Sequence, residues 1–256
     1  MTIFGLNNHR GSCWVNACLQ AIYRLPEVQQ RYSAREADKN NPIDLGLQTI
    51  WLSKGEDGLK DLFECVRTET MPAGHGIGDS HELLQYLCDK VPFLDVLFRF
   101  KIANTVQCSH CKFKEIHEDS VIEFSFSSFG KHIPISDCIR ETVSPHTIED
   151  WACEKCHKKG CTKQQLIGSF PKAMVFHMVS PEGTIDYSSL LVLNNKKYGL
   201  TSVICYSGFH WWTRGRNMPP GSSWYTFDDQ TVTDHGSKQF PVSNMMRVLI
   251  YYRLED

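Results

Sequence analysis

The stretch that decides the fold is Asn8-His9-Arg10-Gly11-Ser12-Cys13-Trp14-Val15-Asn16-Ala17-Cys18-Leu19-Gln20. From Cys13 onward, apolar residues recur at helical spacing, which predicts a helix with one apolar face formed by Val15, Leu19, Ile22 and Tyr23. Ser12 is expected to cap this helix, and Gly11 allows a sharp backbone approach to it. A thiol at a helix N-terminus faces the positive end of the helix dipole, which predicts a lowered pKa and a nucleophilic thiolate. Most cysteines are merely small core residues, so Cys13 alone does not establish a reactive centre.

Two aromatic stretches near the other end of the chain supply possible partners for this thiol. They are Gly208-Phe209-His210-Trp211-Trp212 and Trp224-Tyr225-Thr226-Phe227-Asp228-Asp229, with glycines and prolines between them, and they predict a β-hairpin. In such a hairpin His210 and Asp228 would lie side by side. We expect Asp228 to accept the Nδ1 proton of the imidazole, which leaves the other ring nitrogen to activate a thiol. Taken alone, a histidine or an aspartate at such a position would more often have a structural role than a catalytic one.

Taken together, these segments resemble the ubiquitin-specific proteases. Residues 5–20 are similar to the Cys box of that family, residues 208–212 and 224–229 to its His box, and Asp79-Ser80-His81-Glu82-Leu83-Leu84 to a segment that lies between the two boxes. The matching segments keep the order that they have in the family. The resemblance runs from Gly5 to about Arg253 and therefore covers nearly the whole chain.

The resemblance implies an α+β, papain-like cysteine protease fold with a helical thumb, a β-sheet palm and zinc-tipped β fingers. The periodicity agrees, because residues 13–100 carry helical stripes and the chain turns to strand-like segments from Phe98 onward. We expect one catalytic domain over residues 1–256. Its thumb would span 1–100, its fingers and the start of the palm 101–185, and the rest of the palm 186–256.

The implied activity is hydrolysis of the peptide or isopeptide bond after the C-terminal Gly-Gly of ubiquitin, through a Cys13 acyl-enzyme. His210 would accept the thiol proton and later protonate the leaving amine, while Asp228 orients the imidazole. Asn8 matches the oxyanion-hole residue of the family, with the Cys13 backbone N–H as a second donor. Asp229 matches an acid that supports this polarisation in some members, and it is equally compatible with capping a loop.

Substrate contacts are expected at four further positions. Asp79 and Glu82 match acids that meet the arginines of the ubiquitin tail, and their spacing of three places both on one helix face. Capping of the helix by Asp79 is the alternative interpretation. Gly208 and the ring of Trp211 are expected to wall a narrow channel that admits only Gly-Gly.

Two Cys-x-x-Cys pairs, Cys108 with Cys111 and Cys153 with Cys156, predict a structural Zn²⁺ site with four sulfur ligands. Four protein ligands leave no open position for water, so this metal would be structural. The gap of 41 residues between the pairs implies an excursion of the chain that returns to its start. His110, His157 and Cys161 lie close enough in sequence to replace one of the four ligands.

Composition narrows the functional classes further. A formal net charge of −2 gives no electrostatic reason to expect nucleic acid or an anionic membrane as a partner. We see neither a spanning apolar run nor a signal peptide pattern. Eleven cysteines in a chain of 256 residues, four of them in metal-type pairs, favour a reducing cytoplasmic or nuclear setting over a disulfide scaffold. We expect a monomer whose partners are conjugates of ubiquitin or of a ubiquitin-like modifier.

The chain departs from the family pattern at two places. Trp14 stands where Tyr is usual, and the segment from Cys205 to His210 has almost no room for the family's loop before the catalytic histidine. A more open cleft would follow, which keeps open a protease for another ubiquitin-like modifier or for a viral polyprotein. The sequence is also compatible with an inactive ubiquitin-binding relative and with a purely structural zinc protein. Chain-linkage preference, biological substrate and cellular or viral origin are left open.

Overall fold

The computed structural model describes residues 2–71, 77–126, 132–179, 183–218, 222–238 and 240–254. Helices come first along the described chain, as the sequence predicts. They are α1 (Cys13–Ile22), α2 (Pro26–Ser33), α3 (Pro42–Ser53), α4 (Leu59–Thr70), α5 (Ser80–Lys90) and α6 (Pro92–Phe98). The helices α2, α3 and α6 begin at a proline, whose missing N–H costs nothing in the first turn of a helix. No helix within the described ranges is long and apolar enough to cross a membrane.

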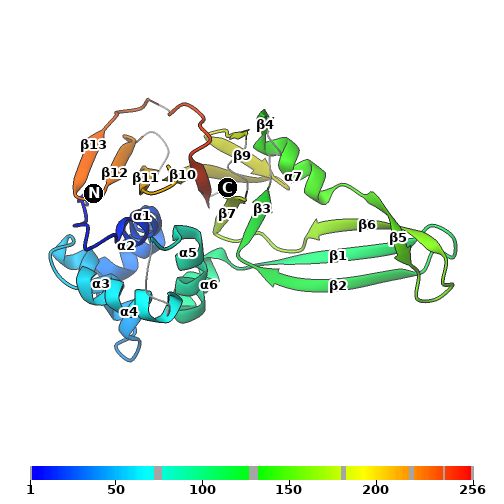
Figure 1. Cartoon of the computed structure of the whole chain (residues 1–256), viewed down its shortest axis with the longest axis horizontal. Helices are drawn as coiled ribbons and strands as arrows, with labels where there is room; N and C mark the ends of the chain where they lie inside the picture. Colours follow the sequence, from blue (N-terminus) through cyan, green and yellow to red (C-terminus); the bar gives the residue numbers. More distant parts are fainter. Residues whose placement is uncertain are drawn as a thin grey trace.

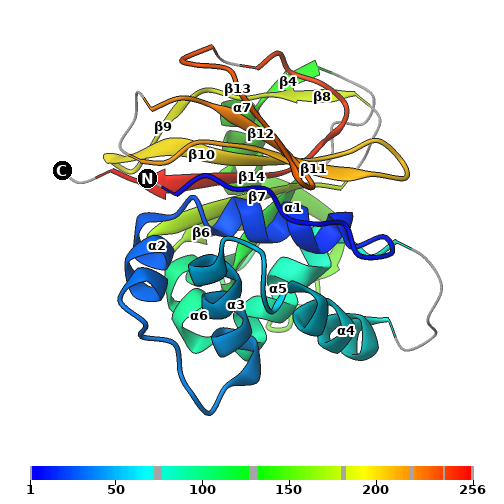
Figure 2. The ribbon, with the colours of Figure 1, turned by 90° about the vertical axis from the view of Figure 1, so that its left-hand side faces the viewer.

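Helix α1 lies at the centre of the molecule, between the other helices and a large sheet (Figure 2). Every one of its residues is buried, so the expectation of a single apolar face is wrong. The polar residues of the helix are accommodated by hydrogen bonds to backbone carbonyls. Asn16 Nδ2 donates to Asn7 O at 3.1 Å, and Gln20 Nε2 donates to Phe4 O at 2.7 Å. These bonds satisfy the amide N–H donors, which would otherwise be costly to bury, whereas Asn16 Oδ1 and Gln20 Oε1 have no partner among the described residues.

The large sheet, which we call the palm sheet, has the strand order β13-β12-β11-β10-β14-β7-β3, and β9 also pairs with β10. Its strands are β3 (Glu123–Phe126), β7 (Ala173–Met178), β9 (Leu190–Leu193), β10 (Lys196–Tyr206), β11 (Trp211–Gly215), β12 (Tyr225–Asp228), β13 (Thr231–Asp234) and β14 (Met246–Arg253). The predicted hairpin is β11 paired with β12, antiparallel, with Thr213 opposite Phe227. Apolar clusters cover both faces of this sheet, which explains why β10 and β14 are almost continuously apolar.

A second sheet, the finger sheet, extends away from this body (Figure 1). Its order is β2-β1-β6-β5, with β1 (Phe100–Cys108), β2 (Lys114–Val121), β5 (His146–Ala152) and β6 (Lys159–Ile167). The expected excursion between the two cysteine pairs therefore comprises β2, β3, the short strand β4 (His132–Pro134), the helix α7 (Ile135–Val143) and β5. Strand β4 pairs with β8 (Thr184–Asp186). The apolar pattern of the sequence also predicts a strand-like stretch over residues 112–129, of which residues 127–129 lie outside the described part of the chain.

Candidate active site

Cys13 is the first residue of α1 and is 2% exposed. Ser12 occupies the N-cap position, as expected, but its side chain makes no cap hydrogen bond. Its Oγ instead accepts from the His9 backbone N–H at 2.8 Å, which ties the preceding loop together. The Gly11 and Ser12 N–H groups donate to Asn8 Oδ1 at 3.0 and 3.1 Å. The loop before the thiol is thus organised by Asn8 rather than by a serine cap.

The expected lowering of the Cys13 pKa is wrong for the free protein. Burial of the thiol raises its pKa, backbone N–H groups led by that of Trp211 oppose the rise, and the negative charge of Asp229 adds to it. The dipole argument considered α1 in isolation, whereas the folded helix end is enclosed and has a carboxylate nearby. The thiol therefore depends on a neighbouring base to become a nucleophile.

His210 and Asp228 lie beside each other, from the residue before β11 and the last residue of β12. Contrary to our expectation, the imidazole nitrogen that meets Asp228 is Nε2, at 2.6 Å from Oδ1. When the neutral imidazole donates from Nε2, its Nδ1 has a free lone pair and can act as the base. The backbone N–H of Trp211 bonds the Cys13 sulfur. His210 directly precedes Trp211 in the chain, so it is one residue away from a group that contacts the thiol.

Asp229 joins the two ends of the chain through two amide side chains. Asn8 Nδ2 donates to Asp229 Oδ2 at 2.7 Å, and Asn16 Nδ2 donates to Oδ1 at 2.7 Å. The Leu6 backbone N–H also donates to the Asp229 carbonyl at 2.9 Å. One hydrogen of the Asn8 amide is therefore committed to Asp229, which sets the direction of the other. The bond from Asn16 to Asp229 is a contact that sequence reasoning missed, because 213 residues separate the partners.

The expected substrate-binding acids lie at the start of α5. Asp79 is its N-cap, with the carboxylate accepting from the backbone N–H groups of His81 at 2.6 Å and Glu82 at 3.3 Å. The capping interpretation of Asp79 is therefore correct, and it leaves the second carboxylate oxygen for another donor. The Glu82 side chain is exposed in the first turn of the helix.

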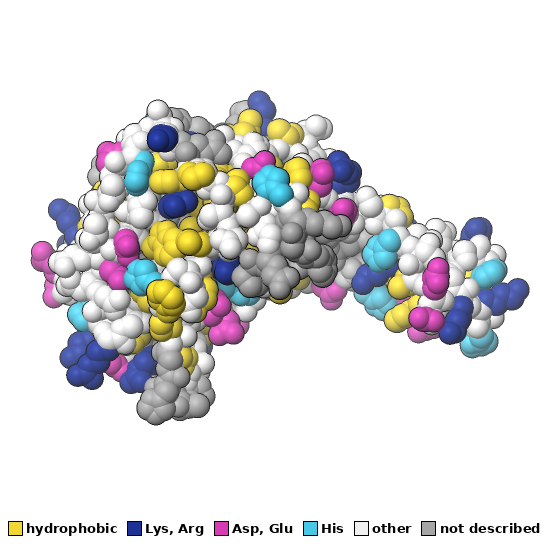
Figure 3. Space-filling view, turned by 45° about the horizontal axis from the view of Figure 1, so that its top comes forward, with side chains coloured by type: hydrophobic (Ala, Val, Ile, Leu, Met, Phe, Trp, Pro, Cys, Tyr) yellow, Lys and Arg dark blue, Asp and Glu magenta, His cyan; other side chains and the backbone are white. Residues whose placement is uncertain are grey.

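Only residues 207–210 connect β10 to β11, and the Ser207 N–H donates to His210 O at 3.1 Å across this turn. Gly208 has a φ of 103° and open space where a side chain would stand. The Trp211 ring is 3% exposed and stacks on Tyr206, whereas Phe209 is 74% exposed. Figure 3 shows apolar, basic and histidine side chains gathered on the body of the molecule in this view.

Four cysteines come together at the tip of the finger sheet. All four Sγ atoms lie within 4.8 Å of one another, with 3.6 Å between Cys108 and Cys156 and between Cys111 and Cys153. A tetrahedral Zn²⁺ with bonds of about 2.3 Å separates its sulfurs by about 3.8 Å, so the residues fit this metal. Backbone N–H groups of the first knuckle, above all that of Cys111, lower the pKa of Cys108 to about 6. Against the lowering effect of the Phe113 N–H, burial and the neighbouring thiols raise the pKa of Cys111 to about 11, so the first proton leaves the group from Cys108. Thiolates are the form that binds zinc.

The three residues that could replace one of these ligands, His110, His157 and Cys161, lie outside the group of four cysteines. His110 Nε2 meets the Lys159 carbonyl at 3.1 Å, and His157 adopts a positive φ of 58° in the second knuckle. Cys161 is 1% exposed and stands opposite Cys108 on the neighbouring strand, outside the group of four. The geometry therefore favours the two Cys-x-x-Cys pairs.

A second polar cluster, which sequence reasoning missed, joins α5 to the palm sheet. His81 Nε2 lies 2.5 Å from Glu123 Oε2, and the ring of His177 stacks on that of His81 with centroids 3.5 Å apart. Burial lowers the pKa of His177 to about 4, and the neighbouring His81 adds to the effect. No local pattern pointed to this cluster, since its members lie on α5, β3 and β7.

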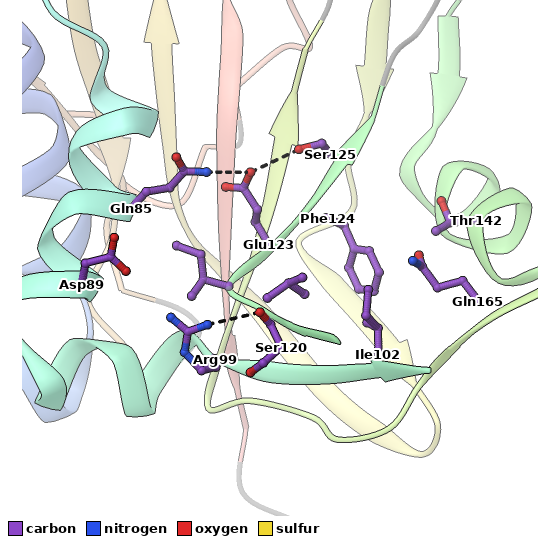
Figure 4. A pocket seen from close by; sticks show the side chains of 12 residues that line it. Gln85, Asp89, Arg99, Ile102, Ser120, Glu123, Phe124, Ser125, Thr142 and Gln165 are labelled. Atoms are coloured by element: carbon purple, nitrogen blue, oxygen red, sulfur yellow. Dashed lines mark hydrogen bonds between the residues drawn. The ribbon is translucent and has the colours of Figure 1, made fainter. Parts of the chain in front are cut away.

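Beside this cluster is a cavity of about 560 Å³ between α5, the base of the finger sheet and α7. Figure 4 shows Gln85 and Ser125 converging on Glu123, at 3.4 and 3.2 Å from Oε1, and Arg99 bonding the Ser120 carbonyl at 3.2 Å. Polar side chains thus line a hollow where the helices and the fingers meet.

Comparison with known proteins defines the class. The model of the family described as "Ubiquitin carboxyl-terminal hydrolase" matches residues 4–251. The chain is 25% identical over 201 residues to ubiquitin carboxyl-terminal hydrolase 47 of Drosophila melanogaster, a match that covers 68% of this chain and 13% of that protein. It is 25% identical over 177 residues to ubiquitin carboxyl-terminal hydrolase 5 of Saccharomyces cerevisiae, covering 52% and 21%. The matched regions therefore span less than a quarter of the length of either relative.

Solved structures share the fold. The SAGA DUB module of Ubp8, Sgf11, Sus1 and Sgf73 bound to monoubiquitin matches with a TM-score of 0.83 at 16% identity, over 99% of this chain and 69% of that one. The yeast SAGA module with a variant Sgf73 gives the same values. The chain belongs to the ubiquitin carboxyl-terminal hydrolase family, and its fold is the predicted α+β fold.

Proposed function

We propose that the chain is a thiol-dependent deubiquitinase that hydrolyses the peptide or isopeptide bond after the C-terminal Gly-Gly of ubiquitin. The proposal is carried by three contacts within a fold of this family: His210 bonds Asp228, the Trp211 N–H bonds the Cys13 sulfur, and Asn8 bonds Asp229. An inactive binder or a purely structural zinc protein has no need of this arrangement. Monoubiquitin bound to the matching SAGA module supports ubiquitin as the ligand.

In the proposed mechanism His210 removes the Cys13 proton through Nδ1, while Asp228 holds Nε2 and stabilises the imidazolium. The thiolate attacks the carbonyl carbon of the terminal glycine, and the leaving amine takes a proton from His210. Water, activated by the same imidazole, then hydrolyses the thioester. Because burial raises the pKa of the Cys13 thiol, the nucleophilic thiolate depends on this proton transfer to His210.

The oxyanion formed in both steps needs donors that are aimed in advance. We assign Asn8 Nδ2 and the Cys13 backbone N–H to this role. Asn8 is held from both ends, because its Oδ1 accepts from the Gly11 and Ser12 N–H groups and its Nδ2 donates to Asp229. Asp229 is thus assigned the positioning of Asn8, which unites its two expected roles.

We assign the substrate contacts to both sides of the site. Asp79 and Glu82 would bind the tail arginines, and Gly208 and the ring of Trp211 would wall the channel for the Gly-Gly tail. The cavity at the base of the fingers would receive part of the body of ubiquitin. Cys108, Cys111, Cys153 and Cys156 would hold a structural Zn²⁺, which stiffens the fingertip.

In this proposal residues 1–256 act as one catalytic domain, with a thumb (1–100), fingers and initial palm (101–185) and remaining palm (186–256). A free thiol nucleophile and a thiolate-bound metal fit the reducing cytoplasm or nucleus. A second candidate substrate is another ubiquitin-like modifier. The observation that favours it is the four-residue turn at 207–210, which would leave the cleft more open than a longer loop.

The test is intact-mass analysis after incubation with ubiquitin that carries a thiol-reactive C-terminal electrophile. Equivalent reagents built on SUMO, NEDD8 and the interferon-induced modifier are run in parallel, with Cys13→Ala as the control. We expect one ubiquitin adduct that Cys13→Ala abolishes. Faster labelling by another modifier would assign that modifier instead, and the lack of any adduct from folded, zinc-loaded protein would refute the proposed activity.

A further inference from the structure

Alternate residues of β11 face opposite sides of the palm sheet. Thr213 is buried against α1, where its Oγ1 donates to Ala17 O at 2.6 Å. Trp212 and Arg214 are half-buried on the other face, which we call the outer face of β11. This face begins at the active site, because the ring of Trp212 stacks on the ring of His210 with centroids 6.2 Å apart.

The positive charge of Arg214 is uncompensated. Its guanidinium lies 4.5 Å from the centroid of the Phe240 ring, and no hydrogen-bond acceptor or ion-pair partner for it is found in the described part of the chain. Nε and Nη1 are shielded from solvent without an acceptor, so Nη2 is the nitrogen that reaches the surface. Enclosed donors without acceptors carry a cost in free energy.

Arg24, Arg216 and Arg247 also lack a carboxylate partner among the described residues, but Arg24 is completely buried, and Arg216 and Arg247 donate to backbone carbonyls. Two further arginines of the body have carboxylate partners. Arg31 pairs with Asp44 at 2.7 Å, and Arg99 pairs with Asp95 at 2.5 Å. A carboxylate of another protein that approaches Nη2 of Arg214 would form a charge-assisted hydrogen bond with it, because Nε and Nη1 are enclosed and only Nη2 is open to a ligand. The ring beneath the guanidinium keeps it in place before a ligand arrives, so little side-chain entropy is lost on binding.

The position of this face indicates which protein supplies the carboxylate. β11 lies on the β12 and β13 side of the palm sheet, whereas β7 and β3 form its opposite side, from which the fingers extend (Figure 1). A ubiquitin whose body occupies the fingers leaves the β11 side to the protein that departs as the amine. We propose that the outer face of β11, through Arg214, binds an acidic segment of the protein to which ubiquitin is attached.

This inference rests on the proposed deubiquitinase activity, and the test separates the two. Three substrates are compared: ubiquitin linked to a lysine flanked by Asp and Glu in a peptide, the same conjugate with Asn and Gln, and ubiquitin with a C-terminal fluorophore. The enzymes are wild type, Arg214→Gln, Arg214→Lys and the control Arg140→Gln, which removes an exposed arginine from α7. Thermal unfolding verifies that each variant is folded.

Wild type is expected to cleave the acidic conjugate with a kcat/KM roughly 5- to 10-fold above that of its amide twin, a preference that shrinks at high salt. Arg214→Gln should abolish the preference, Arg214→Lys should retain part of it, and Arg140→Gln should retain all of it. The fluorogenic substrate should be cleaved equally by all four. Hydrolysis without an acidic preference, or a preference that survives in Arg214→Gln, overturns this inference alone. A folded wild type that leaves every substrate intact overturns the proposed activity as well.

Discussion

At the residue scale, the site depends on side chains that are held by partners from distant parts of the chain. Asn8 is the clearest case, because its amide is fixed by loop N–H groups on one side and by Asp229 on the other. A donor fixed in this way needs no reorganisation when negative charge develops on the substrate, which is the condition for strong electrostatic stabilisation.

Replacing Asn8 by Ala should therefore lower kcat by roughly 100- to 1000-fold with little change in KM, since the lost donor acts on the transition state. Steady-state hydrolysis of a fluorogenic ubiquitin substrate measures both parameters. Asp229→Asn is the companion variant, expected to give a smaller loss because the Asn8 donor itself remains and only its support is altered. Unchanged turnover in Asn8→Ala would discard the oxyanion role.

The ionisation of Cys13 gives a second prediction. Burial and the charge of Asp229 raise the thiol pKa, so a smaller fraction is thiolate at neutral pH than in a free cysteine. In His210→Ala, the rate of Cys13 alkylation by iodoacetamide should keep rising as the pH passes the ordinary thiol value of about 8.5. Adding Asp229→Asn to that variant should shift the curve to lower pH. A plateau below pH 8.5 would show that the helix dipole outweighs burial.

At the element scale, α5 combines a structural cap with a proposed substrate contact in one residue. Asp79 caps the helix through His81 and Glu82, and the helix is bound to the palm sheet through the His81, Glu123 and His177 cluster. This second attachment fixes the helix against β3 and β7. The N-terminus of α5, with its two acids, is therefore held in a defined place relative to the cleft.

The two roles of Asp79 are separable by substitution. Asp79→Ala should lower the free energy of unfolding by about 1 kcal/mol through loss of the cap, whereas Asp79→Ser should retain most of that stability because serine also caps helices. Both variants should raise KM if the carboxylate binds an arginine of the substrate. Chemical denaturation and steady-state kinetics provide the two readouts, with the exposed Glu82→Lys expected to raise KM alone. An unchanged KM in all three would restrict these acids to structure.

At the scale of the whole molecule, the body and the fingers are stabilised in different ways. The body has apolar clusters on both faces of the palm sheet, whereas β2 and β5 at the edges of the finger sheet are largely exposed. A narrow sheet of this kind buries little apolar surface. A metal at its tip would therefore supply stability that apolar burial does not provide there.

Purified protein should therefore contain one Zn²⁺ per chain by elemental analysis, and Cys153→Ser should lose it. If the metal contributes about 3 kcal/mol, its loss should lower Tm by roughly 6–12 °C. Cys65→Ser is the matched control, since Cys65 lies outside the cluster and should keep both metal and Tm. Full metal content in Cys153→Ser would point to Cys161 or a nearby histidine as the replacement ligand.

The sequence by itself determined the features that depend on local patterns. Helical stripes before residue 100 and strand-like segments after it established the class of fold, because burial of one face imposes a period of 3.6 or 2 on neighbouring residues. Spacing alone also paired the four cysteines, since each Cys-x-x-Cys pair makes a knuckle of short range. The segments around Cys13 and His210 indicated a site between the two ends of the chain for the same reason.

Only the tertiary structure decided what those segments contact. It buried α1 on every side, raised the pKa of Cys13, turned Nε2 of His210 toward Asp228 and left Arg214 without an acceptor among the described residues. None of these follows from a local pattern, because each depends on which groups from distant segments enclose the side chain. Burial and hydrogen bonds between residues more than 200 positions apart, such as Asn8 with Asp229, arise only when the whole core is packed.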